Sequence, residues 1–141
     1  MNAELHRRLL CLNADLAATR LSPEDAIWLA CDLLVAEVNT PAVVQLASAS
    51  PKSTYTAEAA RLVEQLLVEL GVEPMTPRQA SWWFARDVAR LMAAGKLDRE
   101  DGENELWALG VELGNADLMP GRLSPAEIVR TADERLRTWT A

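Results

Sequence analysis

The chain has 141 residues, half of them hydrophobic, which is enough for one hydrophobic core and predicts a single domain over residues 1–141. Fourteen basic residues against 21 acidic ones give a net charge of −7 at pH 7, which repels nucleic-acid phosphates and anionic lipid headgroups. Neither a nucleic acid nor a membrane is therefore expected as a partner, because the apolar runs are also too short to cross a bilayer.

Signals for α-helices recur along the whole chain, and no stretch alternates apolar and polar residues as a half-buried strand would. A hydroxyl residue followed by proline marks four helix starts, at Ser22, Thr40, Thr76 and Ser124. The expected helices run over about residues 2–19, 23–38, 41–48, 55–70, 77–94, 99–113 and 125–139, with glycine stops at Gly71, Gly95 and Gly114. The sequence therefore predicts an all-α fold, a compact single-domain bundle of six or seven amphipathic helices.

Two segments share a hydroxyl-proline start followed by tryptophan and aspartate, residues 21–38 and residues 75–94. One interpretation is a duplicated helical hairpin. The other is that capped amphipathic helices arrive at such patterns independently. Two copies are also too few for a solenoid, which would need at least three at a fixed period. The connections at residues 49–54 and 114–124 are the expected irregular stretches.

Residues for common catalytic chemistry are scarce. His6 is the only histidine, which excludes histidine-based triads and histidine-rich metal sites. Cys11 and Cys31 lie among leucine and alanine without a neighbouring base, so we expect buried, reduced thiols in a cytoplasmic protein. Glycine-rich phosphate loops and Cys-x-x-Cys pairs are missing from the sequence. We therefore expect a protein that is not an enzyme and that uses no cofactor and no metal.

Acidic residues concentrate in one segment. Residues 96–121 contain two basic and seven acidic residues, a net charge of −5. Matching the segment to a calcium loop with Gly102 in the sixth position puts Leu97 and Arg99 where ligands belong, so an EF-hand is excluded. Two interpretations remain, a capped helix start whose acids offset the helix dipole and a surface that attracts a basic protein.

Tryptophan is also unusually frequent, with five residues against one Phe and one Tyr. Trp82 and Trp83 are adjacent and point about 100° apart on a helix, so they belong either to the core or to an interface with a partner. Arg86, Asp87 and Arg90 follow one turn later, and their spacing predicts an ion-pair network along the surface of that helix.

A longer pattern combines these features. It reads A-x-x-W-x-A-R-D from Ala80 to Asp87 and G-K-L-D-x-x-D-G-x-x-x-L-W from Gly95 to Trp107. The pattern resembles small acidic all-α actinobacterial proteins of unassigned function, some of which are similar to immunity proteins of toxin systems. The resemblance covers about the second half of the chain and implies no catalytic residue.

Three functional hypotheses follow. The first is a non-catalytic cytoplasmic protein-binding module, of the immunity or inhibitor type, that meets a basic protein partner. Its contact residues would be Asp98, Glu100, Asp101, Glu103, Glu105 and Trp107. The second is a self-associating helical scaffold whose subunit contact is formed by Trp82 and Trp83. The third is an enzyme or a small-ligand protein that uses carboxylates in a helical pocket.

Overall fold

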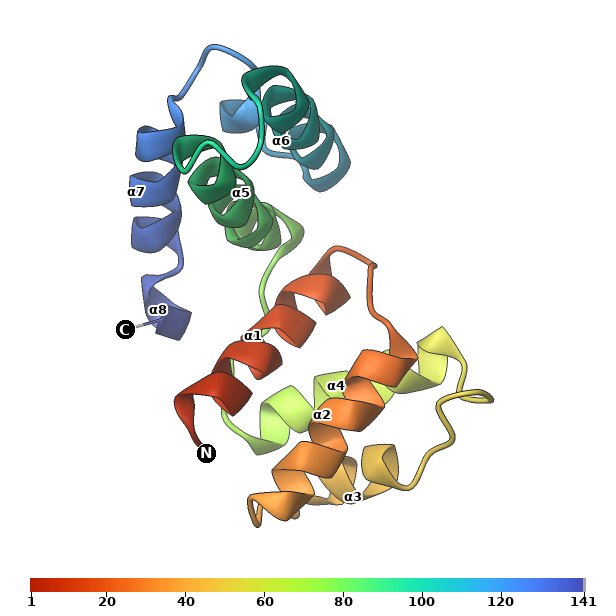
Figure 1. Ribbon diagram of the computed structural model, residues 1–141. Coiled ribbons are helices and arrows are strands. Elements are labelled where there is room, and N and C mark those ends of the chain that lie inside the picture. Colours follow the sequence, from red (N-terminus) through yellow and green to blue (C-terminus); the bar gives the residue numbers. More distant parts are fainter. Residues whose placement is uncertain (141) are drawn as a thin grey trace. The chain divides into compact units, whose positions relative to one another are not determined.

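A computed structural model describes residues 1–140 of the chain. Within these residues the chain forms eight α-helices and one 3-10 helix, with no strand, so the all-α prediction is confirmed (Figure 1). The elements are α1 (Ala3–Ala17), α2 (Pro23–Val35), α3 (Pro41–Ala47), α4 (Thr56–Glu69), α5 (Pro77–Ala93), α6 (Arg99–Leu113), η1 (Ala116–Leu118), α7 (Pro125–Arg135) and α8 (Arg137–Thr140).

The chain divides into two compact helical units, one formed by residues 1–74 and the other beginning at Met75. The sequence predicted one domain over residues 1–141, and that assignment stays a prediction. The same holds for the duplicated hairpin. Its first copy contains α2, which packs chiefly on α3, whereas its second copy contains α5, which packs chiefly on α7.

The first unit consists of α1 to α4. Helix α2 packs against α3, α3 packs against α4, and α1 contacts both α2 and α4. Leucine and valine side chains from all four helices fill the space between them, including Leu9, Leu33, Val43 and Leu66, each fully buried. This is the arrangement that the predicted leucine stripes require, since each amphipathic face is covered by a neighbouring helix.

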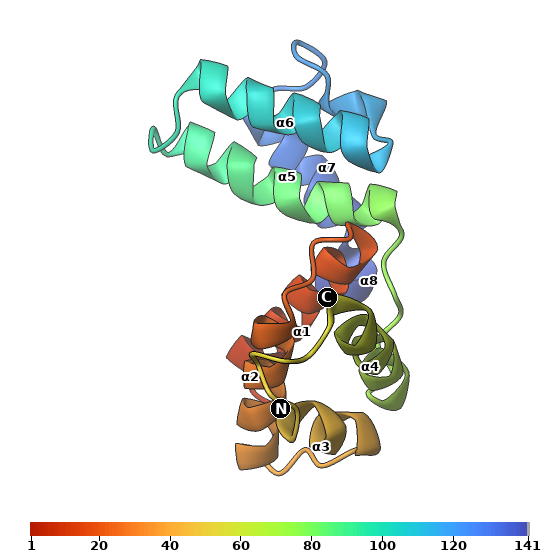
Figure 2. The same ribbon diagram turned by 90° about the vertical axis from the view of Figure 1, so that its right-hand side faces the viewer.

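The second unit is built around α5. Helices α5 and α6 run side by side, joined by a short connection, and α7 packs along α5 (Figure 2). The expected loop at 114–124 contains the 3-10 helix η1, which packs against α6. Asn115 fixes this segment, because its buried side chain donates to Ser81 Oγ of α5 at 2.9 Å and its Oδ1 accepts from the Asp117 amide at 3.2 Å.

The predicted helix starts are confirmed. Ser22, Thr40, Thr76 and Ser124 are all N-caps followed by proline, although the Thr40 side chain, unlike the other three, forms no capping hydrogen bond. Reciprocal capping boxes form at Thr76 with Gln79 and at Ser124 with Glu127. The three predicted glycine stops also hold, because Gly71, Gly95 and Gly114 adopt φ angles of 68°, 71° and 70°.

Other boundaries differ from the prediction. The second helix ends at Val35, where Glu37 adopts a left-handed φ of 65° and the Val38 amide closes the turn on the Leu33 carbonyl at 2.9 Å. The last expected helix divides into α7 and α8 at Leu136, a turn that leaves Leu136 and Trp139 both buried. A helix that ends at a left-handed residue other than glycine has no clear signal in the sequence, so the end of the second helix at Val35 could not be predicted.

Candidate functional site

Helix α6 carries most of the residues that the sequence marked as a contact surface. It begins at Asp98, whose Oδ1 accepts a hydrogen bond from the Asp101 amide at 2.9 Å. Glu100 and Asp101 lie in the first turn, where negative charge is favourable next to the unpaired amides. The capping interpretation of Asp98 is therefore confirmed.

One side of α6 is buried against its own unit. Leu106, Leu109 and Leu113 recur at helical spacing on this side. Gly102 and Gly110 allow close approach there: a Cβ at Gly102 would lie 2.4 Å from Met92 Sδ of α5, and a Cβ at Gly110 would lie 2.6 Å from the Asn115 carbonyl oxygen. Because α6 is held on this side, its other side is fixed as a surface.

The outward side of α6 carries two large apolar side chains where a surface helix is usually polar. Trp107 is 50% exposed and Val111, one turn later, is 64% exposed. Apolar residues thus occur on two opposite sides of α6, one covered and one open. Tryptophan is among the residue types most enriched at the energetic centres of protein interfaces.

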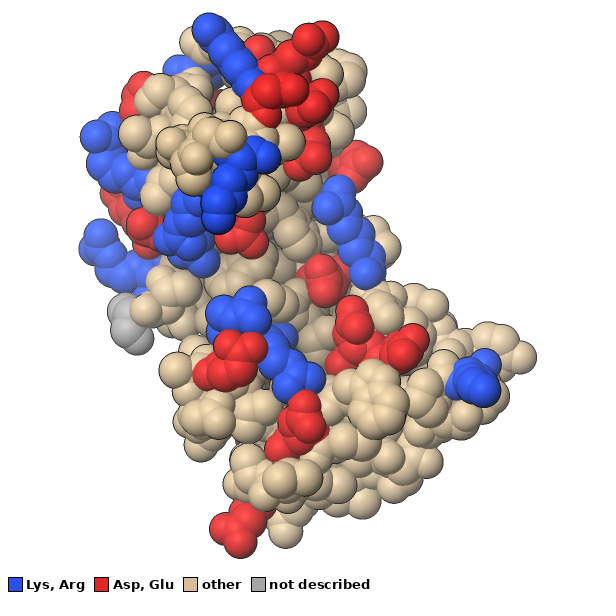
Figure 3. Space-filling model, in the orientation of Figure 1, with Lys and Arg blue, Asp and Glu red and all other residues tan. Residues whose placement is uncertain are grey.

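Three exposed carboxylates lie on the same helix as this apolar pair, and Glu100 shares the stripe of Trp107 because the two residues are seven positions apart. Glu100, Asp101 and Glu105 are exposed and form no ion pair within residues 1–140. Glu103 differs, because it is partly buried and its Oε1 accepts from Arg99 Nε at 2.9 Å. Figure 3 shows carboxylates gathered at the upper right of the view, where α6 lies. We call Glu100, Asp101, Glu105, Trp107 and Val111 the α6 face.

The two adjacent tryptophans of α5 lie elsewhere. Trp82 is 1% exposed and Trp83 is 6% exposed. Of the two interpretations, core or interface, the structure therefore agrees with the core. The Arg86 guanidinium carbon lies 4.9 Å from the centre of the Trp83 ring, within the range of a cation–π contact. With both rings buried, the hypothesis of a subunit contact through Trp82 and Trp83 has no exposed surface to support it.

The predicted surface network on α5 was wrong in its partners. Arg86 is buried, and its Nη1 pairs with Asp133 Oδ1 of α7 at 2.9 Å instead of with Asp87. Arg90 Nη2 approaches the same carboxylate oxygen at 3.7 Å. Asp133 lies 47 residues after Arg86, so helical spacing could not indicate the pair.

Residues 1–140 contain no cluster of three or more metal-ligating side chains, and none of their helices is long and apolar enough to span a membrane. Cys11 and Cys31 form no disulfide within residues 1–140, and both are partly exposed, whereas the sequence predicted buried thiols. Comparisons of the chain with protein-family models, curated proteins and solved structures find no match.

Proposed function

We propose that this protein is a non-catalytic protein-binding module of the cytoplasm, of the immunity or inhibitor type, and that the α6 face receives a basic surface of its partner. The observation that carries the proposal is the exposed Trp107 and Val111 pair, on a helix that also carries three exposed carboxylates without ion-pair partners among residues 1–140. An aromatic anchor supplies affinity, and the negative charge of the same helix selects a basic partner and speeds its approach. Two cysteines that form no disulfide suit a reducing compartment.

The first step of the test is capture of the partner from a lysate of the source organism at low salt. The identified partner is then titrated with the wild-type protein and with Trp107→Ala. Loss of a central interface tryptophan costs about 2 kcal/mol or more, so the dissociation constant should rise at least about 30-fold. The matched control is Trp28→Ala, which removes a tryptophan with the similar exposure of 53% from α2 and should leave the affinity unchanged.

The charged part of the α6 face is tested separately. Glu100→Gln combined with Glu105→Gln should weaken binding at low salt and flatten the salt dependence, because the removed charges attract the partner through screened electrostatics. Glu58→Gln combined with Glu64→Gln removes two exposed carboxylates from α4 and is the control. If Trp107→Ala and the charge variant both bind the partner as tightly as the wild-type protein, the proposal is wrong.

A further inference from the structure

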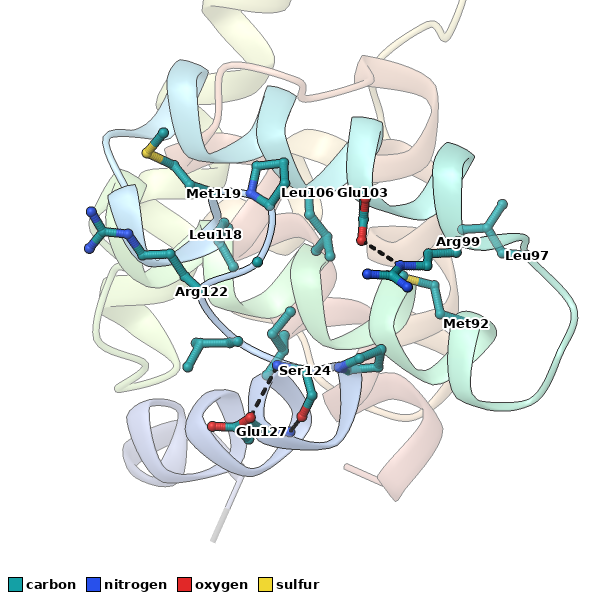
Figure 4. A pocket seen from close by; sticks show the side chains of 15 residues that line it. Met92, Leu97, Arg99, Glu103, Leu106, Leu118, Met119, Arg122, Ser124 and Glu127 are labelled. Carbon is teal, nitrogen blue, oxygen red and sulfur yellow. Dashed lines mark hydrogen bonds and ion pairs between the residues drawn. The ribbon is translucent and has the colours of Figure 1, made fainter.

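A separate hollow lies in the second unit, between α6, the 119–124 connection and the start of α7 (Figure 4). Its volume is about 590 Å³, within the range of roughly 300 to 1,000 Å³ typical of small-molecule sites. We call it the α6–α7 pocket. None of the residues of the α6 face lines it, so it is distinct from the proposed protein contact.

The floor of the α6–α7 pocket is apolar, and its rim carries charged and polar side chains. Leu106, Leu118 and Ile128, which are 4%, 2% and 2% exposed, contribute to its wall together with Met92 and Pro120. Water in contact with such a wall finds few hydrogen-bonding partners, so its replacement by a hydrocarbon group is favourable.

Ionisable side chains at the edge of the pocket decide which charge a bound molecule can carry. The two lining carboxylates are already engaged: Glu103 accepts from Arg99 Nε at 2.9 Å, and Glu127 Oε1 accepts from the Ser124 amide at 3.2 Å. Hydrogen bonds from Ser124 lower the pKa of Glu127, which keeps it ionised and bound to its own helix start.

The two lining arginines retain free donors. Glu103 occupies only Nε of Arg99, and the terminal nitrogens of Arg99 have no partner within residues 1–140. Figure 4 shows the Arg99 guanidinium turned towards the pocket, whereas that of Arg122 points away from it. The hydrogen-bond donor available at the mouth of the pocket is therefore the cationic guanidinium of Arg99, and its hydrogen bond to Glu103 fixes its orientation.

We propose that the α6–α7 pocket binds a small amphipathic carboxylate, with its hydrocarbon tail against Leu106, Leu118 and Ile128 and its carboxylate at the terminal nitrogens of Arg99. The Arg99 side chain is 86% exposed, so the charged head stays hydrated at the mouth while the tail leaves water. Burial of the tail provides most of the affinity, and the exposed ion pair selects the acid over a neutral molecule of the same length.

The test compares octanoate with octan-1-ol, which share a tail and differ in charge. Each is titrated into the ¹⁵N-labelled full chain at low salt, and amide shifts of residues 118–128 are followed. We expect saturable shifts with both probes and about three- to fivefold tighter binding of octanoate, the preference that an exposed ion pair provides.

Variants assign the two parts of the site. Arg99→Gln should remove the preference for octanoate and leave octan-1-ol binding unchanged. Leu123→Trp should fill the pocket and abolish the shifts from both probes. Met119→Trp, at a 45% exposed lining position, serves the same purpose if the first filling variant does not fold. Val68→Trp, at a 74% exposed position of α4, is the control and should bind both probes normally.

Absence of saturable shifts at residues 118–128 would overturn the proposal. The α6–α7 pocket would then be a place where a side chain of a protein partner could bind. Equal affinities for the two probes, or a preference for octanoate that survives Arg99→Gln, would overturn the role of Arg99 and with it the assignment to carboxylates. Neither result bears on the α6 face, because Trp107 and Val111 lie outside the pocket.

Discussion

Two glycines of α6 show that the effect of adding a side chain depends on which atoms face the backbone there. An alanine in place of a glycine inside a helix ordinarily stabilises the helix by about 1 kcal/mol. At Gly110 the added Cβ would lie 2.6 Å from the backbone oxygen of Asn115, an atom fixed by the buried Asn115 side chain. At Gly102 the added Cβ would meet the side chain of Met92, which can rotate away.

We therefore predict opposite behaviour from the two substitutions. Gly110→Ala should destabilise the protein by about 2 kcal/mol, because the connection to η1 has to move. Gly102→Ala should change the stability by less than about 1 kcal/mol. Urea unfolding followed by circular dichroism measures both, and equal losses for the two variants would show that the close approach at Asn115 is not the cause.

Asp15 is a partly buried carboxylate, and this burial makes its ionised form less favourable. Burial, with a smaller contribution from the nearby charge of Asp25, raises the pKa of Asp15 to about 6, against the opposing effect of Arg20. A carboxyl group whose pKa is raised on folding binds more protons in the folded state, so its contribution to stability is present at low pH and is lost as the pH rises from about 4 to about 6.

Asp15→Asn should therefore stabilise the protein at pH 7 by about 1 kcal/mol, a value reduced for the partial solvent exposure of the site. At pH 4, where Asp15 is already protonated, the same substitution should have little effect. Thermal unfolding at the two pH values provides the measurement. A gain that is the same at both would rule out ionisation of Asp15 as its source.

At the scale of elements, the pair between Arg86 and Asp133 joins α5 to α7 in the second unit. Arg86 is buried with its guanidinium over the Trp83 ring, whereas the Asp133 side chain is 52% exposed. The two partners are therefore not equivalent, since loss of the carboxylate would leave a buried cation without its partner and loss of the arginine would leave an exposed carboxylate that water can solvate.

From this asymmetry we expect Asp133→Ala to cost about 2 kcal/mol and Arg86→Met about 1 kcal/mol or less, because methionine keeps apolar contact with Trp83. Chemical unfolding of the two single variants and of the double variant forms the comparison. The double variant should be no less stable than Asp133→Ala alone. A larger loss for Arg86→Met than for Asp133→Ala would contradict the assignment of Arg86 as the dependent partner.

Elements also account for the candidate sites. Close packing of α6 on its glycine side fixes which side faces outward, and the end of η1 with the following connection lines one side of the α6–α7 pocket. The two proposals thus use different sides of one helix, the first through Trp107 and the second through Leu106.

At the scale of the whole molecule, the net charge of −7 at pH 7 opposes association between copies. Association should strengthen as the pH falls towards the isoelectric point of about 4.7, where this repulsion vanishes. Light scattering at pH 7 and near pH 5 tests the expectation, and added salt at pH 7 should act in the same direction through screening. A dimer at pH 7 that salt dissociates would instead indicate a specific contact between copies through ion pairs.

The sequence by itself determined the helical class, the four hydroxyl-proline starts and the three glycine stops, because each depends on atoms within about one turn of the chain. It also located the acidic segment and Trp107, since composition and spacing are properties of the chain alone. Local information could not determine whether Trp82 and Trp83 are covered, which carboxylate Arg86 meets, or that Leu106, Leu118 and Ile128 share a pocket. Those features join residues tens of positions apart, and only the packing of the helices brings them together.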